Sequence, residues 1–404
     1  MKERDLTSDH IEPSASSMNV AIPARVDVAI VGGGIIGLAV AEELCTRGRS
    51  VVVLDDGARA GISTLAAAGM LAPAAEADVE LPGLAEFRNF SHSLYPEFVS
   101  RVERRSGMEC GFRQEGTLLV ALDRDHVAEV ERLRGIMSSQ GFATRPLEAA
   151  EVLEMEPALS PRIVGGVLVP QDFHVDQRRL LLALRLAVEA ERGIVIRDAR
   201  VERVTAAGEV EGKRGPEGVS FALTAAHVVV AGGSWTNVEL QSPCANLPVR
   251  PVKGQVVRLH APGLLQRVIR IPEVYLVPHW GGDLVVGATV EEQGFDASPT
   301  AGGVFDLLRH AWRTIPGIYD APLKEISVGF RPCTRDHRPL IGRVEGRVFV
   351  ATGHYRNGVL QAPGTARLLA ALLCGEPAPP LLQYFDPERI SGPEDASQLV
   401  SRRR

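Results

Sequence analysis

The segment from residue 26 to residue 56 constrains the fold of this chain more than any other. A short apolar run, VDVAIV, is followed at once by GGGIIG, then by apolar residues at helical spacing, and finally by a second apolar run, SVVVLDD. Strands at the centre of a parallel sheet are buried on both faces and have continuous apolar sequences. The segment therefore predicts a strand–helix–strand unit of about thirty residues.

Three glycines at the first turn of this unit form the pattern GxGxxG. Gly32 permits the tight turn, Gly34 lets a backbone approach a pyrophosphate, and Gly37 lets the helix pack closely on the sheet. The free N–H groups and positive dipole end of the helix then face the phosphates. Asp55 ends the second strand, where a carboxylate accepts hydrogen bonds from a ribose hydroxyl. Together these features indicate a dinucleotide site rather than a purely structural turn.

A run of small residues, STLAAAGMLAP, follows the second strand from Ser63 to Pro73. Small side chains let a backbone pass close to a flat ring system, which would suit a flavin. A tightly packed helix start would have the same composition. Taken alone, the run supports both interpretations equally.

The length of 404 residues exceeds the roughly 250 to 300 at which one hydrophobic core stops growing, so two domains are expected. Elements of the first type return at HVVVAGG and RVFVATG, whereas residues 247–287 are rich in strands punctuated by proline, with a hairpin turn at HWGGD. We expect a discontinuous cofactor domain with an inserted substrate domain. The expected boundaries are 26–108, 165–240 and 327–376 for the cofactor domain, 109–164 and 241–326 for the substrate domain, and tails at 1–25, which should be flexible, and 377–404.

Composition and motifs argue against several classes of protein. The net charge of −6 gives no electrostatic reason to bind nucleic acid. Five scattered cysteines without a CxxC favour reduced thiols in the cytoplasm over disulfides or zinc, and no histidine spacing suggests a metal. The longest apolar run, Val28 to Ala41, has 14 residues with four glycines and is too short for a membrane span. Residues 1–25 lack the apolar core of an export signal, and Met18 is an alternative start.

Seven motifs between residues 26 and 375 resemble, in order, the D-amino-acid oxidase superfamily of FAD-dependent oxidoreductases, and most closely its glycine oxidase branch of the thiamine pathway. They are VAIVGGGIIGLAVAEEL, STLAAAGML, HVVVAGGSWT, VYLVP, LVVGATV, VGFRPCTRDHRPLIGR and GHYRNGVLQAPGTARLLA. The resemblance implies an α/β fold, α+β overall: a Rossmann-type FAD-binding domain plus a substrate domain with a large antiparallel sheet. It also implies noncovalent FAD and a homo-oligomer, a tetramer or a dimer.

The resemblance assigns cofactor contacts to five groups of residues. The pyrophosphate turn would hold Ile35 and Ile36, and the adenosine ribose would meet Asp55 and Asp56. Val201 would offer backbone groups to the adenine. The flavin would lie along Ser63, Thr64, Ala68, Gly69 and Met70. A loop would wrap the isoalloxazine and its pyrimidine edge, formed by His354, Tyr355, Arg356, Asn357, Gly358, Val359 and Leu360.

The resemblance places Arg331 at the substrate carboxylate, with Tyr275 and Arg356 close by. An arginine fork grips a planar carboxylate with two parallel hydrogen bonds, whereas lysine supplies only a point charge. The alternative for Arg331 is a strand-end salt bridge to Asp336 or another surface acid. Arg356 stands beside an Asn-Gly turn signal, and Tyr275 would also suit a core aromatic position.

Three positions depart from the family pattern or invite comparison. Asp55 stands where glutamate is common, and it still reaches a ribose. Val290 stands where a bulkier residue can border the substrate pocket. Cys333 invites comparison with the covalent flavin cysteine of sarcosine oxidases, but it differs in position relative to the TRD turn, so an ordinary buried thiol is expected.

The implied reaction is oxidation of glycine, sarcosine or small D-amino acids to the imine and keto acid, with O2 reduced to H2O2 and with no acid or base residue required. The imine would hydrolyse or supply thiazole synthesis. The alternatives are a D-amino-acid dehydrogenase of the same fold using a quinone, a flavin-binding module for assembly or sensing, and a nicotinamide dehydrogenase.

Overall fold

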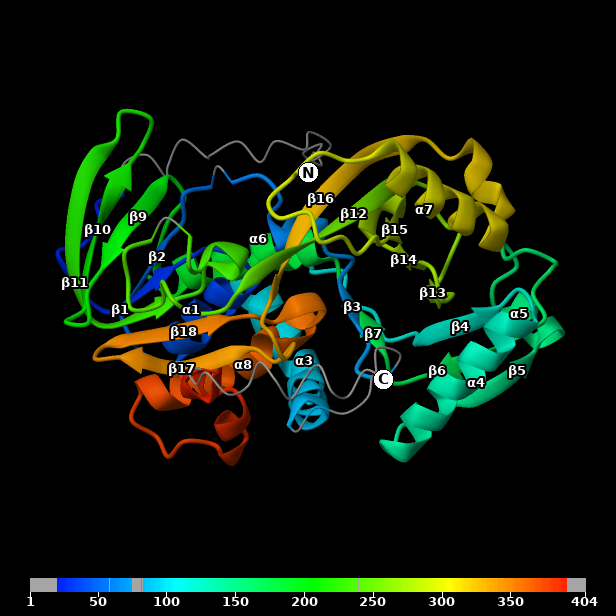
Figure 1. Cartoon of the computed structure of the whole chain (residues 1–404), viewed down its shortest axis with the longest axis horizontal. Coiled ribbons are helices and arrows are strands. Elements are labelled where there is room, and N and C mark those ends of the chain that lie inside the picture. Colours follow the sequence, from blue (N-terminus) through cyan, green and yellow to red (C-terminus); the bar gives the residue numbers. More distant parts are fainter. Residues whose placement is uncertain (1–19, 58, 75–80, 82, 239, 391–404) are drawn as a thin grey trace.

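The computed structural model describes residues 20–57, 59–74, 81, 83–238 and 240–390. Residues 1–19 of the tail predicted at 1–25, and the end at 391–404, lie outside the described residues. In the described part, the chain forms two eight-stranded sheets. The sheets lie side by side along the long axis, with the first sheet on the left in Figure 1. The expected α/β class with two large sheets is confirmed.

The first sheet contains the predicted strand–helix–strand unit at its centre. Strand β1 (Arg25–Val31) pairs in parallel with β2 (Val51–Leu54) on one side and with β11 (Val219–Val230) on the other. The order is completed by β8 (Ile194–Ile196) beside β2, by β18 (Val348–Thr352) and antiparallel β17 (Leu340–Glu345) beyond β11, and by the ribbon β9 (Ala199–Val204) and β10 (Glu209–Arg214).

Four helices cover one face of the first sheet: α1 (Ile35–Thr46), α3 (Leu84–Ser106), α6 (Gln177–Ala190) and α8 (Gly358–Leu373). Alternate residues of β1 divide between the two faces, because Val28 and Ile30 pack with these helices while Ala29 packs on the opposite side. The β9–β10 ribbon and residues 240–249 cover that opposite face. Burial on both sides explains why the central strands have unbroken apolar sequences.

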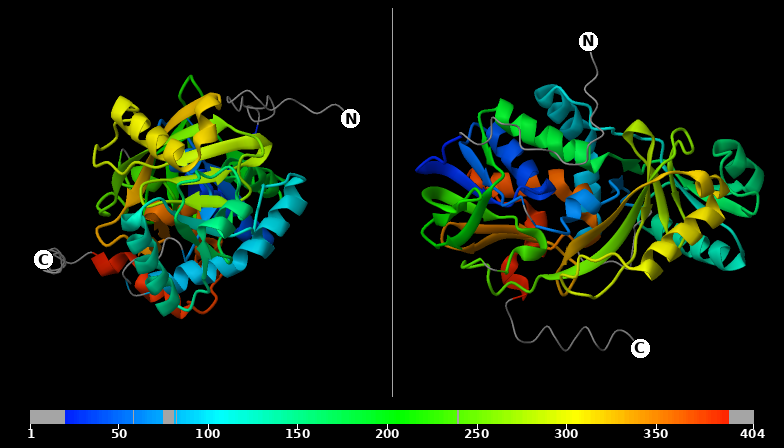
Figure 2. Two further views of the ribbon diagram at one scale, coloured as in Figure 1. Left: turned by 90° about the vertical axis from the view of Figure 1, so that its right-hand side faces the viewer. Right: turned by 90° about the horizontal axis from the view of Figure 1, so that it is seen from above.

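The second sheet is antiparallel except for one parallel pair. It is formed, in spatial order, by β16 (Leu323–Cys333), β12 (Arg250–His260), β15 (Asp283–Gly287), β14 (Tyr275–Pro278), β13 (Val268–Arg270), β4 (Thr117–Ala121), β6 (Gly165–Val169) and β5 (Arg145–Glu148), with β13 and β4 parallel. Helix α7 (Ala301–Thr314), yellow in Figure 2, packs on its outer face. The predicted HWGGD hairpin joins β14 to β15.

The remaining elements are short or lie at the edges. They are α2 (Ser63–Ala66), α4 (Arg124–Ser139), α5 (Ala149–Met155), the two-stranded pair β3 (Met70–Leu71) and β7 (Phe173–His174), and 3-10 turns at Gly233–Trp235, Trp280–Gly282, Pro316–Asp320, Tyr355–Asn357, Pro380–Tyr384 and Pro387–Ile390.

Sheet membership differs from the expected boundaries at two strands. Residues 165–169 form β6 of the second sheet, although the cofactor domain was expected to resume at residue 165. Residues 327–333 likewise belong to β16 of the second sheet. The predicted tail from residue 377 is also wrong as far as residue 390, because Leu381 and Phe385 are buried against the helices of the first sheet.

Helix α8 begins earlier than the sequence suggests, so residues 354–360 are not a loop but a 3-10 turn followed by the first turn of the helix. Pro363 lies inside the helix and has no N–H for the carbonyl of Val359, and the hydroxyl of Tyr95 donates to that carbonyl instead. Gly364 lets α3 approach, because a methyl group there would lie 2.8 Å from Cβ of Ser91. Tertiary contacts thus stabilise a helix whose local sequence disfavours it.

Candidate active site

A large cavity lies between the carboxyl ends of the parallel strands and the inner face of the second sheet. Its lining includes the residues that follow β1, β2, β11 and β18, together with residues of β12, β14 and β16. Crevices beyond the carboxyl ends of parallel strands are where such sheets bind ligands. The volume open to the centre of a water molecule is about 260 Å³, whereas one water needs about 10–15 Å³ by the same measure. The cavity is therefore sized for a large ligand.

The glycine turn forms one end of the cavity. Gly32 has a φ of +113°, and a methyl group on it would lie 2.5 Å from the carbonyl oxygen of Ala231. A methyl group on Gly37 would lie 2.0 Å from the carbonyl oxygen of Gly32, so only glycine lets α1 pack here. Gly34 differs, because a methyl group there would meet only the hydroxyl of Thr64, at an ordinary contact distance of 3.6 Å. Gly32 and Gly37 thus require glycine for the tight turn and the close helix packing, and Gly34 lines the cavity beside them.

The first turn of α1 faces the cavity, and its N-cap residue supplies no capping side chain. Gly34 occupies the N-cap position, and no side chain bonds to the helix start from it. The hydroxyl of Thr64 accepts from the N–H of Ile35 at 3.2 Å, and both residues line the cavity with Ile36. Uncapped N–H groups at a helix start are suited to an anion. This turn fits the pyrophosphate of FAD.

Asp55 lies at the cavity wall, as expected, but its carboxylate also supports the glycine turn. Oδ2 accepts from the N–H of Gly33 at 2.8 Å, and Oδ1 accepts from the N–H of Gly57 at 3.0 Å. Asp56 also lines the cavity and pairs with Arg59 at 2.9 Å. Val201 lines the same end of the cavity. Asp55 thus holds the glycine turn in place, and it lines the cavity where the ribose is expected.

The run of small residues lies along the cavity wall. Ser63, Thr64 and residues 66–70 all line the cavity. Gly69 has a φ of +73°, and a methyl group there would lie 1.9 Å from the carbonyl oxygen of Val175. Only glycine therefore fits against Val175 here. Residues 66–69 carry no side chain larger than a methyl group, so the cavity wall they form would accommodate a flat ring system.

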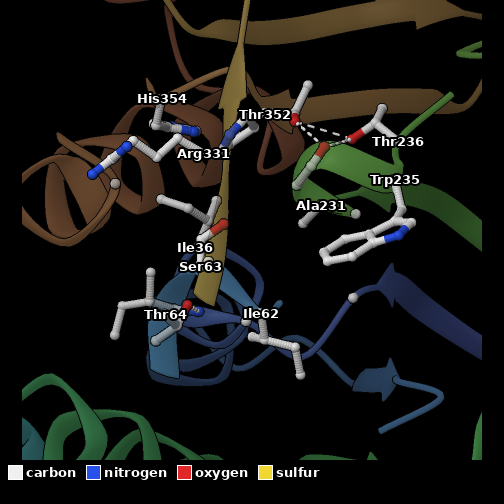
Figure 3. Close-up of a pocket in the computed structure, with 18 of the residues that line it drawn as sticks. Ile36, Ile62, Ser63, Thr64, Ala231, Trp235, Thr236, Arg331, Thr352 and His354 are labelled. Atoms are coloured by element: carbon white, nitrogen blue, oxygen red, sulfur yellow. Dashed lines mark hydrogen bonds between the residues drawn. The ribbon is translucent and has the colours of Figure 1, made fainter. Parts of the chain in front are cut away.

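Arg331 enters the cavity from β16, which the preceding residue anchors to the first sheet. The N–H of Phe330 donates to the carbonyl of Gly61 at 2.9 Å. The carbonyl of Phe330 accepts from the hydroxyls of Ser63 and Ser234. These contacts join the two sheets at the residue that precedes Arg331, so they determine where the guanidinium points. Figure 3 shows Arg331 and His354 at one side of the pocket and Trp235 at the other.

The Arg331 guanidinium contacts backbone oxygens only. It donates to the carbonyls of Thr289 at 3.0 Å and Lys253 at 3.3 Å, and among the described residues it pairs with no carboxylate. Gly254 makes room for it, because a methyl group there would lie 2.5 Å from both terminal nitrogens. Carbonyl oxygens carry no net charge, so these contacts leave the guanidinium able to pair with an incoming anion.

The alternative pairing of Arg331 with Asp336 is wrong. Asp336 instead pairs with Arg338 at 2.9 Å and with Arg389 at 3.1 Å. Burial would raise the pKa of Asp336, but the charge and hydrogen bonds of Arg389, together with Arg338, outweigh it and lower the pKa. The acid is thus satisfied on the far side of its turn, away from the cavity lining.

Residues 354–359 form another wall. His354, Tyr355, Arg356, Gly358 and Val359 line the cavity, whereas Asn357 and Leu360 do not. His354 is buried with Nε2 3.0 Å from the hydroxyl of Thr365, and burial lowers its pKa to about 3. Arg356 is exposed, with its guanidinium carbon 5.3 Å from the ring centre of Tyr355.

Tyr275 lines the cavity from β14, where Gly287 makes room for its ring. Val290 is 58% exposed and is not part of the lining. Cys333 is also outside the lining, fully buried, with its pKa raised by burial. Its position agrees with the expected ordinary buried thiol.

Several lining residues were not singled out from the sequence. The motif HVVVAGGSWT pointed to some of them, whereas the glycines of the second sheet gave no local signal. They are Gly33, Arg59, Ile62, Ala67, Ala231, Gly232, Gly233, Trp235, Thr236, Gly254, Gly329 and Thr352.

Comparison with known proteins agrees with this site. Residues 27–372 match the family described as DAO, FAD dependent oxidoreductase. The bifunctional protein ThiO/ThiG of Nostoc sp. is 36% identical over 373 residues, which cover 89% of this chain and 54% of that protein. The glycine oxidase of Geobacillus kaustophilus is 34% identical over 86% of this chain and 93% of that protein, and its crystal structure has a TM-score of 0.79 over 88% of this chain and 96% of that chain. The iminodiacetate oxidase of Chelativorans sp. BNC1 has a TM-score of 0.78 at 28% identity, covering 89% of this chain and 98% of that chain.

The chain therefore belongs to the DAO family of FAD-dependent oxidoreductases, and FAD is its cofactor. It spans about half the length of the bifunctional relatives that it matches. Among the described residues, no helix combines the length and the apolar character that crossing a membrane requires.

Proposed function

We propose that this protein oxidises glycine and other small amines, such as sarcosine and small D-amino acids, with O2 as electron acceptor. The observation that carries the proposal is Arg331, a guanidinium without a carboxylate partner among the described residues. It lines the same cavity as the run of small residues from Ser63 to Met70, which we call the flavin-lining run. The similarity to glycine oxidases along nearly the whole chain supports it.

The residues of the cavity divide the work of the reaction. Arg331 would bind the substrate carboxylate through two parallel hydrogen bonds, with Tyr275 and Arg356 nearby. Ser63, Thr64 and residues 68–70 would hold the flavin ring, and the glycine turn with Asp55 would hold the rest of FAD. When bound, FAD would accept a hydride from the substrate Cα and pass the electrons to O2. Because Arg331 and the residues that would hold the flavin line one cavity, they would keep the substrate Cα close to the flavin ring in a near-attack geometry.

The balance of the reaction requires no acid or base side chain. The substrate amine loses a hydride from Cα and a proton from nitrogen, O2 takes both to become H2O2, and water converts the imine to the keto acid and ammonia. The lining carboxylates, Asp55 and Asp56, bond to the glycine turn and to Arg59. His354 is neutral and bonded to Thr365. The substrate amine would need only to be neutral when the hydride leaves.

A D-amino-acid dehydrogenase of the same fold, with a quinone as acceptor, is the second candidate, because it would need the same grip on the substrate carboxylate and the same flavin cradle. Oxygen consumption and peroxide should be measured with glycine, sarcosine, iminodiacetate and D-alanine, and quinone reduction should be measured without air. Peroxide formed stoichiometrically with glyoxylate would support the oxidase. Turnover only with the quinone would support the dehydrogenase. Turnover with neither would leave the flavin-binding module as the better account.

The cellular setting belongs to the same proposal. Similarity to the ThiO/ThiG proteins suggests that the imine supplies thiazole synthesis. We further propose noncovalent FAD, a cytoplasmic location, a homo-oligomer and two domains that correspond to the two sheets. The position of Cys333 outside the cavity supports the noncovalent cofactor. Gel filtration with light scattering and acid release of FAD would test the oligomer and the linkage.

A further inference from the structure

The flavin-lining run has a structural weakness that its composition creates. Residues 66–69 are three alanines and a glycine, so no side chain larger than a methyl group locks this backbone by packing. The same residues line the cavity on one side. Their position therefore depends on hydrogen bonds made from the other side.

Three carbonyls of the run are bonded from behind. The carbonyl of Gly69 accepts from the N–H of Val175 at 2.9 Å. The carbonyl of Leu65 accepts from Nε of Arg178 at 3.0 Å, and the terminal nitrogens of Arg178 grip Glu325 at 2.8 and 2.9 Å. The carbonyl of Ala68 lies 2.8 Å from Nε2 of His279. The side chains that make these contacts, Arg178, Glu325 and His279, are not part of the cavity lining.

The neighbours of His279 determine its tautomer. Nδ1 lies 3.3 Å from a terminal nitrogen of Arg258, which can only donate, so Nδ1 must accept. The carbonyl of Ala68 can only accept, so Nε2 must carry the hydrogen. The ring is therefore neutral and donates to Ala68, and its side chain is fully buried. Asp176, 3.7 Å from Nδ1, completes the surroundings.

Strand β14 and the residue that follows it connect this contact to the substrate end of the cavity. Alternate residues of a strand share one face, so Tyr275 and Val277 point the same way. His279 follows β14 with an extended backbone, φ −117° and ψ 170°, which continues this alternation. Tyr275 lines the cavity, Val277 belongs to the same apolar cluster as Ala68, and His279 bonds to the carbonyl of Ala68. The motif YLVPH thus supports both the flavin-lining run and the substrate pocket.

We propose that His279, oriented by Arg258, is a positioning residue for FAD: it holds the backbone of Ala68 against the flavin ring without touching the cofactor. The inference rests on the FAD dependence of the family and not on the identity of the substrate. Loss of this bond should leave a buried carbonyl unsatisfied and let the run move away from the ring.

The test compares His279→Leu with His279→Gln in the holoenzyme. A glutamine amide can donate to Ala68 while its oxygen accepts from Arg258, whereas leucine can do neither. We expect His279→Leu to release FAD about tenfold or more readily on dilution, followed by flavin fluorescence, and to shift the flavin midpoint potential. His279→Gln should restore both toward the wild type.

The matched control is His126→Leu, which removes another buried histidine whose Nε2 lies 3.1 Å from Glu273, outside the cavity lining. It should leave FAD release and the potential unchanged. Equal FAD release in His279→Leu and the wild type would overturn the proposal, as would a His279→Gln variant as weak as leucine. If His279→Leu does not fold, Arg258→Met, which frees the tautomer, must weaken FAD retention in the same direction, and unchanged retention would refute the proposal.

Discussion

Gly254→Ala should damage substrate binding while sparing the fold. Gly254 lies on β12 directly opposite Gly329 of β16, beneath the guanidinium of Arg331. An added methyl group would lie 2.5 Å from both terminal nitrogens and 2.6 Å from the central carbon. Ordinary contacts begin near 3.4 Å. The guanidinium must therefore move by about 1 Å, and a misplacement of about 1 Å in a binding group can reduce catalysis by about 10²-fold.

The stability cost should be small because the displaced atoms are the far end of a flexible side chain. We expect kcat/KM for glycine to fall about 100-fold, with a melting temperature close to that of the wild type and with full FAD content. The dissociation constant of acetate, a carboxylate without an amine, should rise by a similar factor. The dissociation constant would be measured from the change in flavin absorbance as acetate is added.

The matched control is Gly302→Ala on α7, where an added methyl group meets no atom within 4 Å. This variant should leave kcat/KM for glycine and the dissociation constant of acetate unchanged. Unchanged acetate binding in Gly254→Ala would refute the placement of the carboxylate at Arg331. Loss of FAD together with activity would instead place Gly254 in cofactor binding.

Three further predictions concern the glycine turn, helix α8 and His354. Gly37→Ala would set a methyl group 2.0 Å from a backbone oxygen, so the purified variant should lose its visible FAD spectrum and about 1–3 kcal/mol or more of stability. Tyr95→Phe should cost about 1–3 kcal/mol in chemical denaturation, because the carbonyl of Val359 that Pro363 leaves free becomes unsatisfied. Burial lowers the pKa of His354 to about 3, below the usual 6.5 of the unfolded chain. The contribution of the neutral His354 to the free energy of unfolding is therefore fully present above pH 6.5 and is lost as the pH falls toward 3. The free energy of unfolding should be lower by about 2 kcal/mol at pH 5 than at pH 7.

Each of these predictions has an internal control. Gly135→Ala, on α4 with no atom within 4 Å of the added methyl group, should not lower stability. In a Pro363→Ala background the new N–H can satisfy Val359, so a Tyr95→Phe penalty of the same size there would contradict the explanation. His354→Gln should flatten the pH dependence between 5 and 7, and an equally steep dependence would assign it to other groups.

Local patterns predicted the parts of the site that are contiguous in sequence. The glycine turn, Asp55 and the small-residue run follow one another within about forty residues, and each has a physical signature of its own. Arg331 was assigned by the resemblance to the family rather than by a local pattern. The strand–helix–strand unit was predictable because β1 and β2 are buried on both faces.

What could not be predicted depends on contacts between distant segments. The room that Gly254 gives Arg331 arises from the register of β12 and β16, and the bond from His279 to Ala68 joins residues 211 apart. The early start of α8 and the packing of Phe385 have the same cause, because tertiary partners override local helix breakers and a proline-rich composition. Local sequence carries no record of such partners.

Arg331 is proposed to hold the substrate carboxylate beside the flavin. The decisive experiment is anaerobic mixing of the purified yellow protein with glycine, with flavin absorbance followed in the wild type and in Arg331→Met. We expect glycine to bleach the wild type, with a rate that saturates in glycine, and to bleach Arg331→Met at least 100-fold less efficiently despite full FAD content. A wild-type protein that stays yellow with glycine, sarcosine and small D-amino acids, or a variant that bleaches as fast as the wild type, would contradict the account.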